Sequence, residues 1–93
     1  MEQQIQVKAS DEVLKGVYCN NMQVSHTKEE FVLDFLNILP PAGQFVARVI
    51  TNPSHYKRIV NAMQINLELY EKNFGSVEEA TALDEKRIGF KTT

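Results

Sequence analysis

The sequence predicts an α+β fold, in which a four-stranded antiparallel β-sheet, arranged as a meander, precedes one long C-terminal α-helix. Three observations indicate it. Apolar and polar residues alternate in the first half of the chain, two prolines and a glycine separate two apolar runs, and residues 53–74 carry apolar side chains at helical spacing. We expect a single domain over residues 1–75 and a flexible C-terminal tail over residues 76–93, where apolar residues are scattered among charges.

Length and composition set the class of protein. The chain has 93 residues, 43% hydrophobic residues and a net charge of −2. One domain of this size has a marginal core, which oligomerisation often supplements. Cys19 is the single cysteine, which excludes an intramolecular disulfide and fits a reducing compartment. The first residues do not read as a signal peptide and no apolar run is long enough to span a membrane, so we expect a cytoplasmic protein with no membrane partner.

The first half of the sheet is predicted from alternation. Residues 5–9 alternate apolar and polar side chains and predict the first strand. Residues 11–16 predict a turn, in which Gly16 is free to adopt a positive φ. Residues 17–26 predict the second strand, and a break in its alternation at Asn20 and Asn21 suggests a β-bulge that places Val17, Cys19, Met22 and Val24 on one face.

The second half of the sheet is a predicted hairpin. Residues 31–38 and 44–51 form its strands, and residues 39–43 reverse the chain, with Gly43 in the left-handed region. Opposed residues of antiparallel strands share a face. A short loop therefore sets three pairs: Leu36 with Val46, Val32 with Ile50, and Asp34 with Arg48. We interpret Asp34 and Arg48 as a structural ion pair rather than an acid–base site, because an isolated charge in an apolar strand is costly.

The helix begins and ends at recognisable signals. Asn52 is a good N-cap, Pro53 suits the first helical position and Gly75 is expected to terminate the helix. A first apolar stripe consists of Tyr56, Val60, Met63, Leu67, Tyr70 and Phe74. A second stripe consists of Ile59, Ala62, Ile65 and Leu69, and it widens the apolar surface beyond what one sheet face needs.

This surplus of apolar surface predicts self-association, most simply as a homodimer. Strands 31–38 and 44–51 are apolar on both faces, and the chain has only one helix to cover them. The candidate contact residues are Val32, Leu36, Val46 and Ile50 on the sheet and Ile59, Ile65 and Leu69 on the helix.

No catalytic or metal-binding constellation is apparent. His26 and His55 form no ligand pair at helical spacing, and Cys19 with His26 as a base lacks a third, orienting group. We therefore expect Cys19 to be a small buried strand residue, and we expect neither enzymatic activity nor a cofactor. An active site shared between two chains is the remaining enzymatic alternative.

Two segments suggest other partners. Ser54, His55, Lys57 and Arg58 crowd the first turns of the helix, where free N–H groups and basic side chains could bind phosphate, nucleic acid or an acidic protein. A solvated basic face is the favoured explanation for these residues. In the tail, an acidic half (Glu78, Glu79, Asp84, Glu85) precedes a basic and apolar half (residues 86–91), which suggests either a short partner-binding motif or a solubilising tail.

Several of these motifs occur together in a known family. They are residues 16–20 (GVYCN), 30–35 (EFVLDF), Pro40–Pro41, 48–50 (RVI), 53–58 (PSHYKR) and 70–75 (YEKNFG). Together they resemble the uncharacterised prokaryotic family called domain of unknown function 3467, over about residues 5–75. The resemblance implies no activity. It does imply a transcription-linked partner, such as RNA polymerase, because members are encoded beside genes for RNA polymerase large subunits in Bacteroidetes-like bacteria.

The predicted order of elements is also similar to the protomer of the SecB export chaperone, at the level of the fold alone. We therefore interpret the chain as a self-associating, non-enzymatic protein-binding or scaffolding module. The alternatives are a transcription-linked accessory protein that uses the basic helix N-terminus and a SecB-like chaperone.

Overall fold

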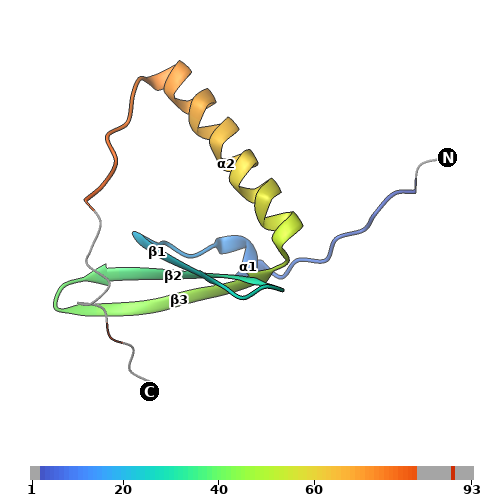
Figure 1. Cartoon of the computed structure of the whole chain (residues 1–93), viewed down its shortest axis with the longest axis horizontal. Coiled ribbons are helices and arrows are strands. Elements are labelled where there is room, and N and C mark those ends of the chain that lie inside the picture. The colour runs from blue at the N-terminus through green and yellow to red at the C-terminus, as the bar shows by residue number, and fades with distance from the viewer. Residues whose placement is uncertain (1–2, 82–88, 90–93) are drawn as a thin grey trace.

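A computed structural model describes residues 3–81 and residue 89. The elements follow in the order α1 (Asp11–Lys15), β1 (Asn21–His26), β2 (Phe31–Leu39), β3 (Ala42–Thr51) and α2 (Pro53–Phe74) (Figure 1). The three strands form one antiparallel sheet in the order β1-β2-β3. The α+β class and the meander are therefore confirmed, with three strands among the described residues instead of four.

The predicted first strand does not form. Residues 3–10 adopt neither helix nor strand, and Ile5 and Val7 are almost fully exposed. Alternation alone cannot make a strand, because a strand requires a neighbour that satisfies its backbone groups. The prediction of a turn at 11–16 was also wrong, since α1 lies there. Ser10 caps it by accepting a hydrogen bond from Val13 N–H. Gly16 ends the helix with the positive φ that was expected, 78°.

The second predicted strand is shorter than expected and has no bulge at Asn20. β1 starts at Asn21, and residues 17–20 precede it. The Asn20 side chain takes the place of strand pairing: its Nδ2 donates to Ile38 O and its Oδ1 accepts from Ile38 N, both at 2.8 Å. These two bonds anchor the start of β1 on β2.

The sheet contains an irregularity elsewhere, in the β2–β3 pair. Val32 lies opposite Ile50 and Asp34 opposite Arg48, as predicted. Phe35 then pairs with Ala47 but Leu36 pairs with Phe45, so the predicted Leu36–Val46 pair is wrong. Val46 is the extra residue of a β-bulge, which changes the alternation of β3 and puts Phe45 on the same face as Arg48. The Arg48 guanidinium carbon lies 5.3 Å from the centre of the Phe45 ring.

The turn between β2 and β3 is tighter than the predicted loop. β2 continues to Leu39 and β3 begins at Ala42, so the turn contains Pro40 and Pro41, which a cis peptide bond joins. Gly43 was expected in the left-handed region but pairs with Ile38 inside the sheet. A Cβ at Gly43 would lie 3.4 Å from the Ile38 side chain, so the glycine leaves room for that neighbour.

The helix α2 begins and ends where the sequence predicts. The Asn52 side chain accepts from His55 N–H at 2.8 Å, and Gly75, at φ 94°, donates to Glu71 O. We expect Asn52→Ala to lower the free energy of unfolding by about 1 kcal/mol, because the capping bond is lost. Urea unfolding followed by circular dichroism measures this loss. Asn52→Asp is the control and should keep the cap; if Asn52→Ala is as stable as Asn52→Asp, the cap does not stabilise α2.

The two faces of the sheet have different surroundings. The ring of Phe31 stacks on Tyr56 of α2, with centroids 3.9 Å apart and planes at 3°. Phe31 and the residues that share its side form the helix-side face: Met22, Val24, His26, Leu33, Phe35, Ala47 and Val49. The other side is the far face, formed by Val32, Asp34, Leu36, Phe45, Arg48 and Ile50.

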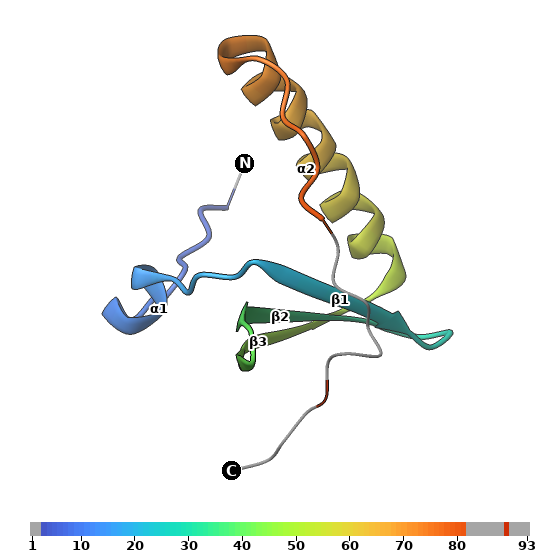
Figure 2. The same ribbon diagram turned by 90° about the vertical axis from the view of Figure 1, so that its left-hand side faces the viewer.

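Beyond its first turns, α2 leaves the sheet. The helix has 22 residues, or about 33 Å, and it rises from the end of β3 at a steep angle (Figure 1). A view turned by 90° shows the same separation (Figure 2). The apolar core among the described residues consequently reduces to Leu33 and Leu36, with Asp34 as a buried charge beside them.

Candidate functional site

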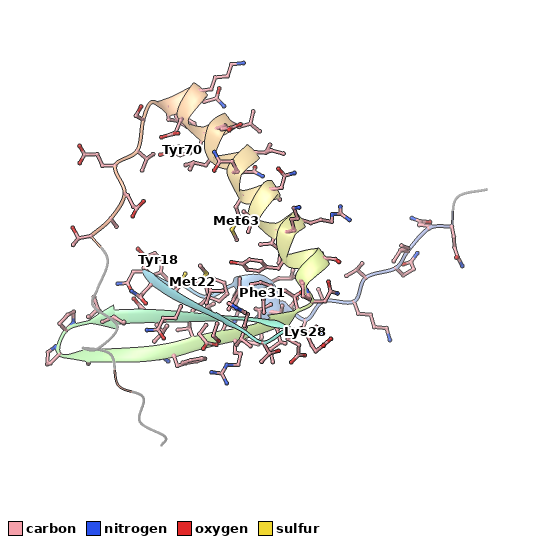
Figure 3. The ribbon with its side chains drawn as sticks, viewed as in Figure 1. Tyr18, Met22, Lys28, Phe31, Met63 and Tyr70 are labelled. Atoms are coloured by element: carbon pink, nitrogen blue, oxygen red, sulfur yellow. The ribbon has the colours of Figure 1, made fainter. Side chains whose placement is uncertain are left out.

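The most unusual feature of the structure is the exposed apolar stripe of α2. We call the residues Tyr56, Val60, Met63, Leu67, Tyr70 and Phe74 the α2 seam. Tyr56 is half-buried against Phe31, but Met63 is 55% exposed and Leu67 45% exposed. Figure 3 shows Met63 and Tyr70 on the side of α2 that overhangs the sheet, above Met22 and Phe31. The seam therefore faces the sheet, but most of its side chains stay exposed.

The sheet face below the seam also has exposed apolar side chains. On the helix-side face, Met22, Val24 and Val49 each keep roughly two fifths of their surface exposed. Large exposed apolar patches on small proteins mark interaction surfaces. The helix-side face and the α2 seam together form the candidate site, an association surface rather than a catalytic one.

Sequence reasoning missed this surface because it assigned the first stripe of the helix to the chain's own sheet. The structure brings only Tyr56 into a ring contact with the sheet. One signal could have indicated the difference. The seam residues are spaced 4, 3, 4, 3 and 4 apart, which is the a/d spacing of a coiled-coil seam and suits a partner helix as well as a sheet.

The predicted contact residues are spread over several surfaces. Leu36 is 3% exposed and is already buried in its own chain, so it has no surface to offer a partner. Val32, Val46 and Ile59 are half-buried. The exposed ones are Ile50, on the far face, and Ile65 and Leu69, on the side of α2 opposite the seam. The structure therefore does not bring the seven residues together in one patch.

Asp34 and Arg48 meet on the far face in a two-pronged contact. Arg48 Nε donates to Asp34 Oδ1 at 2.7 Å and Arg48 Nη2 donates to Asp34 Oδ2 at 3.0 Å. Asp34 is 7% exposed, whereas the Arg48 side chain is 54% exposed. The hydrogen bond and the charge of Asp34 raise the pKa of Arg48 above its ordinary value. A group whose pKa is raised by folding stabilises the folded chain while it is protonated. The contribution of Arg48 is therefore lost only in strongly alkaline solution, where the arginine would lose its proton.

The basic residues predicted as an anion site lie on the first turns of α2. Ser54, His55, Lys57 and Arg58 are all exposed. Pro53 has no N–H, and the N–H of His55 is bonded to Asn52. Two of the first three helical positions thus have no free donor for an anion, which reduces the value of this helix N-terminus as a binding site.

The candidates for chemistry are not brought together. Cys19 was expected to be buried in a strand, but it is exposed and precedes β1. His26 lies at the far end of β1, roughly 20 Å along the chain from Cys19, and its ring lies 5.2 Å from that of Phe31. Within residues 3–81, no three His, Cys, Asp or Glu side chains gather as metal ligands would. An open hollow beside α1 is lined by Glu12, Val13, Gly16 and Val17.

The structure describes only part of the predicted tail, residues 76–81 and 89. Residues 76–81, including Glu78 and Glu79, have no regular structure, and Val77 N–H donates to Glu71 Oε2 at 2.9 Å. The other charges of the suggested tail motif, Asp84, Glu85, Lys86 and Arg87, lie outside the described residues. None of the described helices combines the length and the apolar content that a membrane crossing needs.

Comparison with protein families gives a clear result. The model of the family described as Protein of unknown function (DUF3467) matches residues 1–79. The chain belongs to this family. The DUF3467 match covers α1, the whole sheet and α2, and so includes the candidate site. Neither the curated proteins nor the solved structures yield a match, so the likeness to SecB stays a prediction.

Proposed function

We propose that this DUF3467 chain is a non-enzymatic protein-binding module that self-associates through the apolar surfaces of its sheet and helix. One observation carries the proposal. Among the described residues, the seam residues beyond Tyr56 are each between 45% and 75% exposed, and Met22, Val24 and Val49 of the helix-side face are each between 39% and 45% exposed. Large exposed apolar patches of this kind mark interaction surfaces on small proteins.

Energetics favour covering this surface. Full burial of a large apolar side chain stabilises a protein by about 1.5–3 kcal/mol, so covering several that are about half-exposed is comparable to the whole stability of a small domain. The described residues of one chain bury only Leu33 and Leu36 among their apolar side chains. A second chain is the simplest source of the missing contacts.

Sedimentation equilibrium over a wide range of concentration tests the proposal. We expect twice the monomer mass of 10.6 kDa, with dissociation on dilution. A mass of 10.6 kDa at every concentration would refute self-association. A mass larger than that of a dimer would support self-association but would show that the oligomer contains more than two chains.

The side of α2 that makes the contact is tested by one pair of variants. Leu67 lies on the seam and Ile65 on the opposite side of the helix, and the two are 45% and 47% exposed. We expect Leu67→Asp to give a monomer, because a charge on the seam has to be desolvated in the interface. Ile65→Asp should leave the mass unchanged. The reverse result would assign the contact to the second apolar stripe.

The same exposed surface also favours a chaperone-like role, in which unfolded clients occupy the apolar walls. The discriminating measurement is the aggregation of an unfolding test protein in the presence of the chain. A self-contained dimer leaves aggregation unchanged, whereas a chaperone suppresses it, and Leu67→Asp should then weaken the suppression.

A further inference from the structure

The α2 seam has the spacing of a two-stranded coiled coil. Its six residues run from Tyr56 to Phe74 with alternating steps of four and three, which places them at the a and d positions of consecutive heptads. In this frame Lys57, Gln64 and Glu71 all occupy e positions and so lie along one flank of the seam. Ile59, Asn66 and Asn73 occupy g positions along the other flank.

We propose that two copies of the chain pair their α2 helices antiparallel through this seam, so that the C-terminal end of each helix covers the helix-side face of the other copy's sheet. The proposal rests on the self-association proposed above and adds the surface, the orientation and the register. A second copy is favoured over another partner because the seam is complementary to itself, in both its core layers and its flanking charges.

The core layers match in one antiparallel register. In that register all six seam residues find partners across the two-fold axis: Tyr56 faces Phe74 of the second copy, Val60 faces Tyr70, and Met63 faces Leu67. The small Val60 meets a large ring, and the two aromatic residues at the ends of the seam meet each other. No seam residue is left unpaired.

The flanking charges select the antiparallel orientation. Antiparallel helices bring e positions together, so Lys57 of each copy lies beside Glu71 of the other, twice per dimer, with Gln64 beside its own symmetry mate. A parallel pair would instead set Lys57 beside Asn52 and Glu71 beside Asn66, with no opposite charges together. In the described part of the chain neither Lys57 nor Glu71 belongs to a salt bridge.

This charge pair cannot form within one chain. Lys57 and Glu71 are separated by about 21 Å along α2. Glu71 Oε2 accepts from Val77 N–H, and no cation among the described residues forms a salt bridge with this carboxylate. In the proposed dimer, Lys57 of the second copy supplies the positive charge beside Glu71.

The same arrangement explains why the helix-side face and the C-terminal end of α2 are both exposed in the single chain. The antiparallel register places Phe74 of the second copy next to Tyr56, at the point where α2 meets the sheet. Phe74 is 75% exposed in the single chain, and Met22 of the helix-side face lies exposed below α2 (Figure 3). Val24, on the same face, is 39% exposed. The end of α2 that is beyond the reach of its own sheet therefore covers the sheet of its partner.

Cysteine cross-linking tests the orientation directly. In a Cys19→Ser background, Lys57→Cys and Glu71→Cys proteins are mixed under denaturing conditions, refolded together and oxidised. We expect a disulfide-linked dimer from the mixture and little from either protein alone. Arg58→Cys mixed with Lys72→Cys is the matched control, since these positions have the same separation but lie away from the seam. The control mixture should remain uncross-linked.

Charge reversal tests the pairing without cross-linking. We expect Lys57→Glu to raise the dimer dissociation constant about tenfold, because two attractions become two repulsions. The double variant Lys57→Glu, Glu71→Lys should restore the wild-type value, whereas Glu71→Lys alone should weaken the dimer as Lys57→Glu does. Loss in both single variants with rescue in the double variant indicates pairing between copies, because a better match to the helix dipole would strengthen each single variant instead. Circular dichroism verifies that each variant keeps its helix.

The outcomes separate this inference from the self-association on which it rests. Cross-linking only in the Lys57–Glu71 mixture, with rescue by the double variant, supports the antiparallel pair. A wild-type dimer with cross-links in the single-variant samples, or without rescue, overturns the antiparallel pair and keeps the proposed function. A wild-type monomer at all concentrations overturns both.

Discussion

Leu36→Ala is expected to lower the free energy of unfolding by about 3 kcal/mol, a large part of the stability of so small a chain. Leu36 is 3% exposed and, with Leu33, is one of the two buried apolar side chains among the described residues. Its removal leaves a cavity that the rest of the chain is too small to refill. Urea unfolding at one fixed protein concentration measures the loss, since dimerisation makes apparent stability depend on concentration.

Ile38→Ala is the matched control for Leu36. Ile38 lies on the same strand and the same face, but it is only half-buried and faces Gly43, which has no side chain. We expect Ile38→Ala to lower the free energy of unfolding by about 1 kcal/mol. Equal losses for the two variants would show that the core is not centred on Leu36.

Arg48→Met is expected to destabilise the chain more than Asp34→Asn does. The two residues form one ion pair, but only Asp34 is buried. Without Arg48, the buried carboxylate has no counter-charge, whereas an Arg48 without its carboxylate can turn into solvent. Asp34→Asn loses one charge-assisted bond and should cost about 2 kcal/mol. The urea midpoints of the two variants give the order.

The double variant Asp34→Leu, Arg48→Met separates the value of the pair from the penalty of breaking it. Because it leaves no buried charge unpaired, we expect it to be more stable than Arg48→Met alone. A double variant less stable than Arg48→Met would contradict this expectation, and one less stable than the wild-type chain would mean that the pair contributes net stability. If Asp34→Asn is less stable than Arg48→Met, the argument from the unequal burial of the two residues is wrong.

Local signals predicted the elements that local chemistry controls. The helix α2 could be read from Asn52 and Gly75 because capping depends on neighbouring residues. The Asp34–Arg48 register followed from charge pairing on a two-residue period. The sequence also contains the start signal of α1, which is Ser10 followed by two acidic residues. The segment was nevertheless predicted as a turn, because Gly16 is a common turn residue.

The errors occurred where a residue depends on a distant partner. Residues 5–9 alternate as a strand does, yet no neighbouring strand pairs with them. The bulge at Val46 could not be found from β3 alone, because a bulge exists only relative to the strand beside it. Asn20 appeared to be a break in a strand, while its amide is the anchor that joins β1 to Ile38 of β2.

The sequence by itself determined the class of the fold, the hairpin, the charged pair within it and the bounds of the long helix, because each depends on residue type and local spacing. It also showed that the chain carries more apolar surface than it can cover. Only the tertiary structure decided which apolar surface that is. The direction in which α2 leaves the sheet exposes Met63, Leu67 and Tyr70, and that direction depends on the packing of Tyr56 against Phe31 rather than on any pattern within the helix.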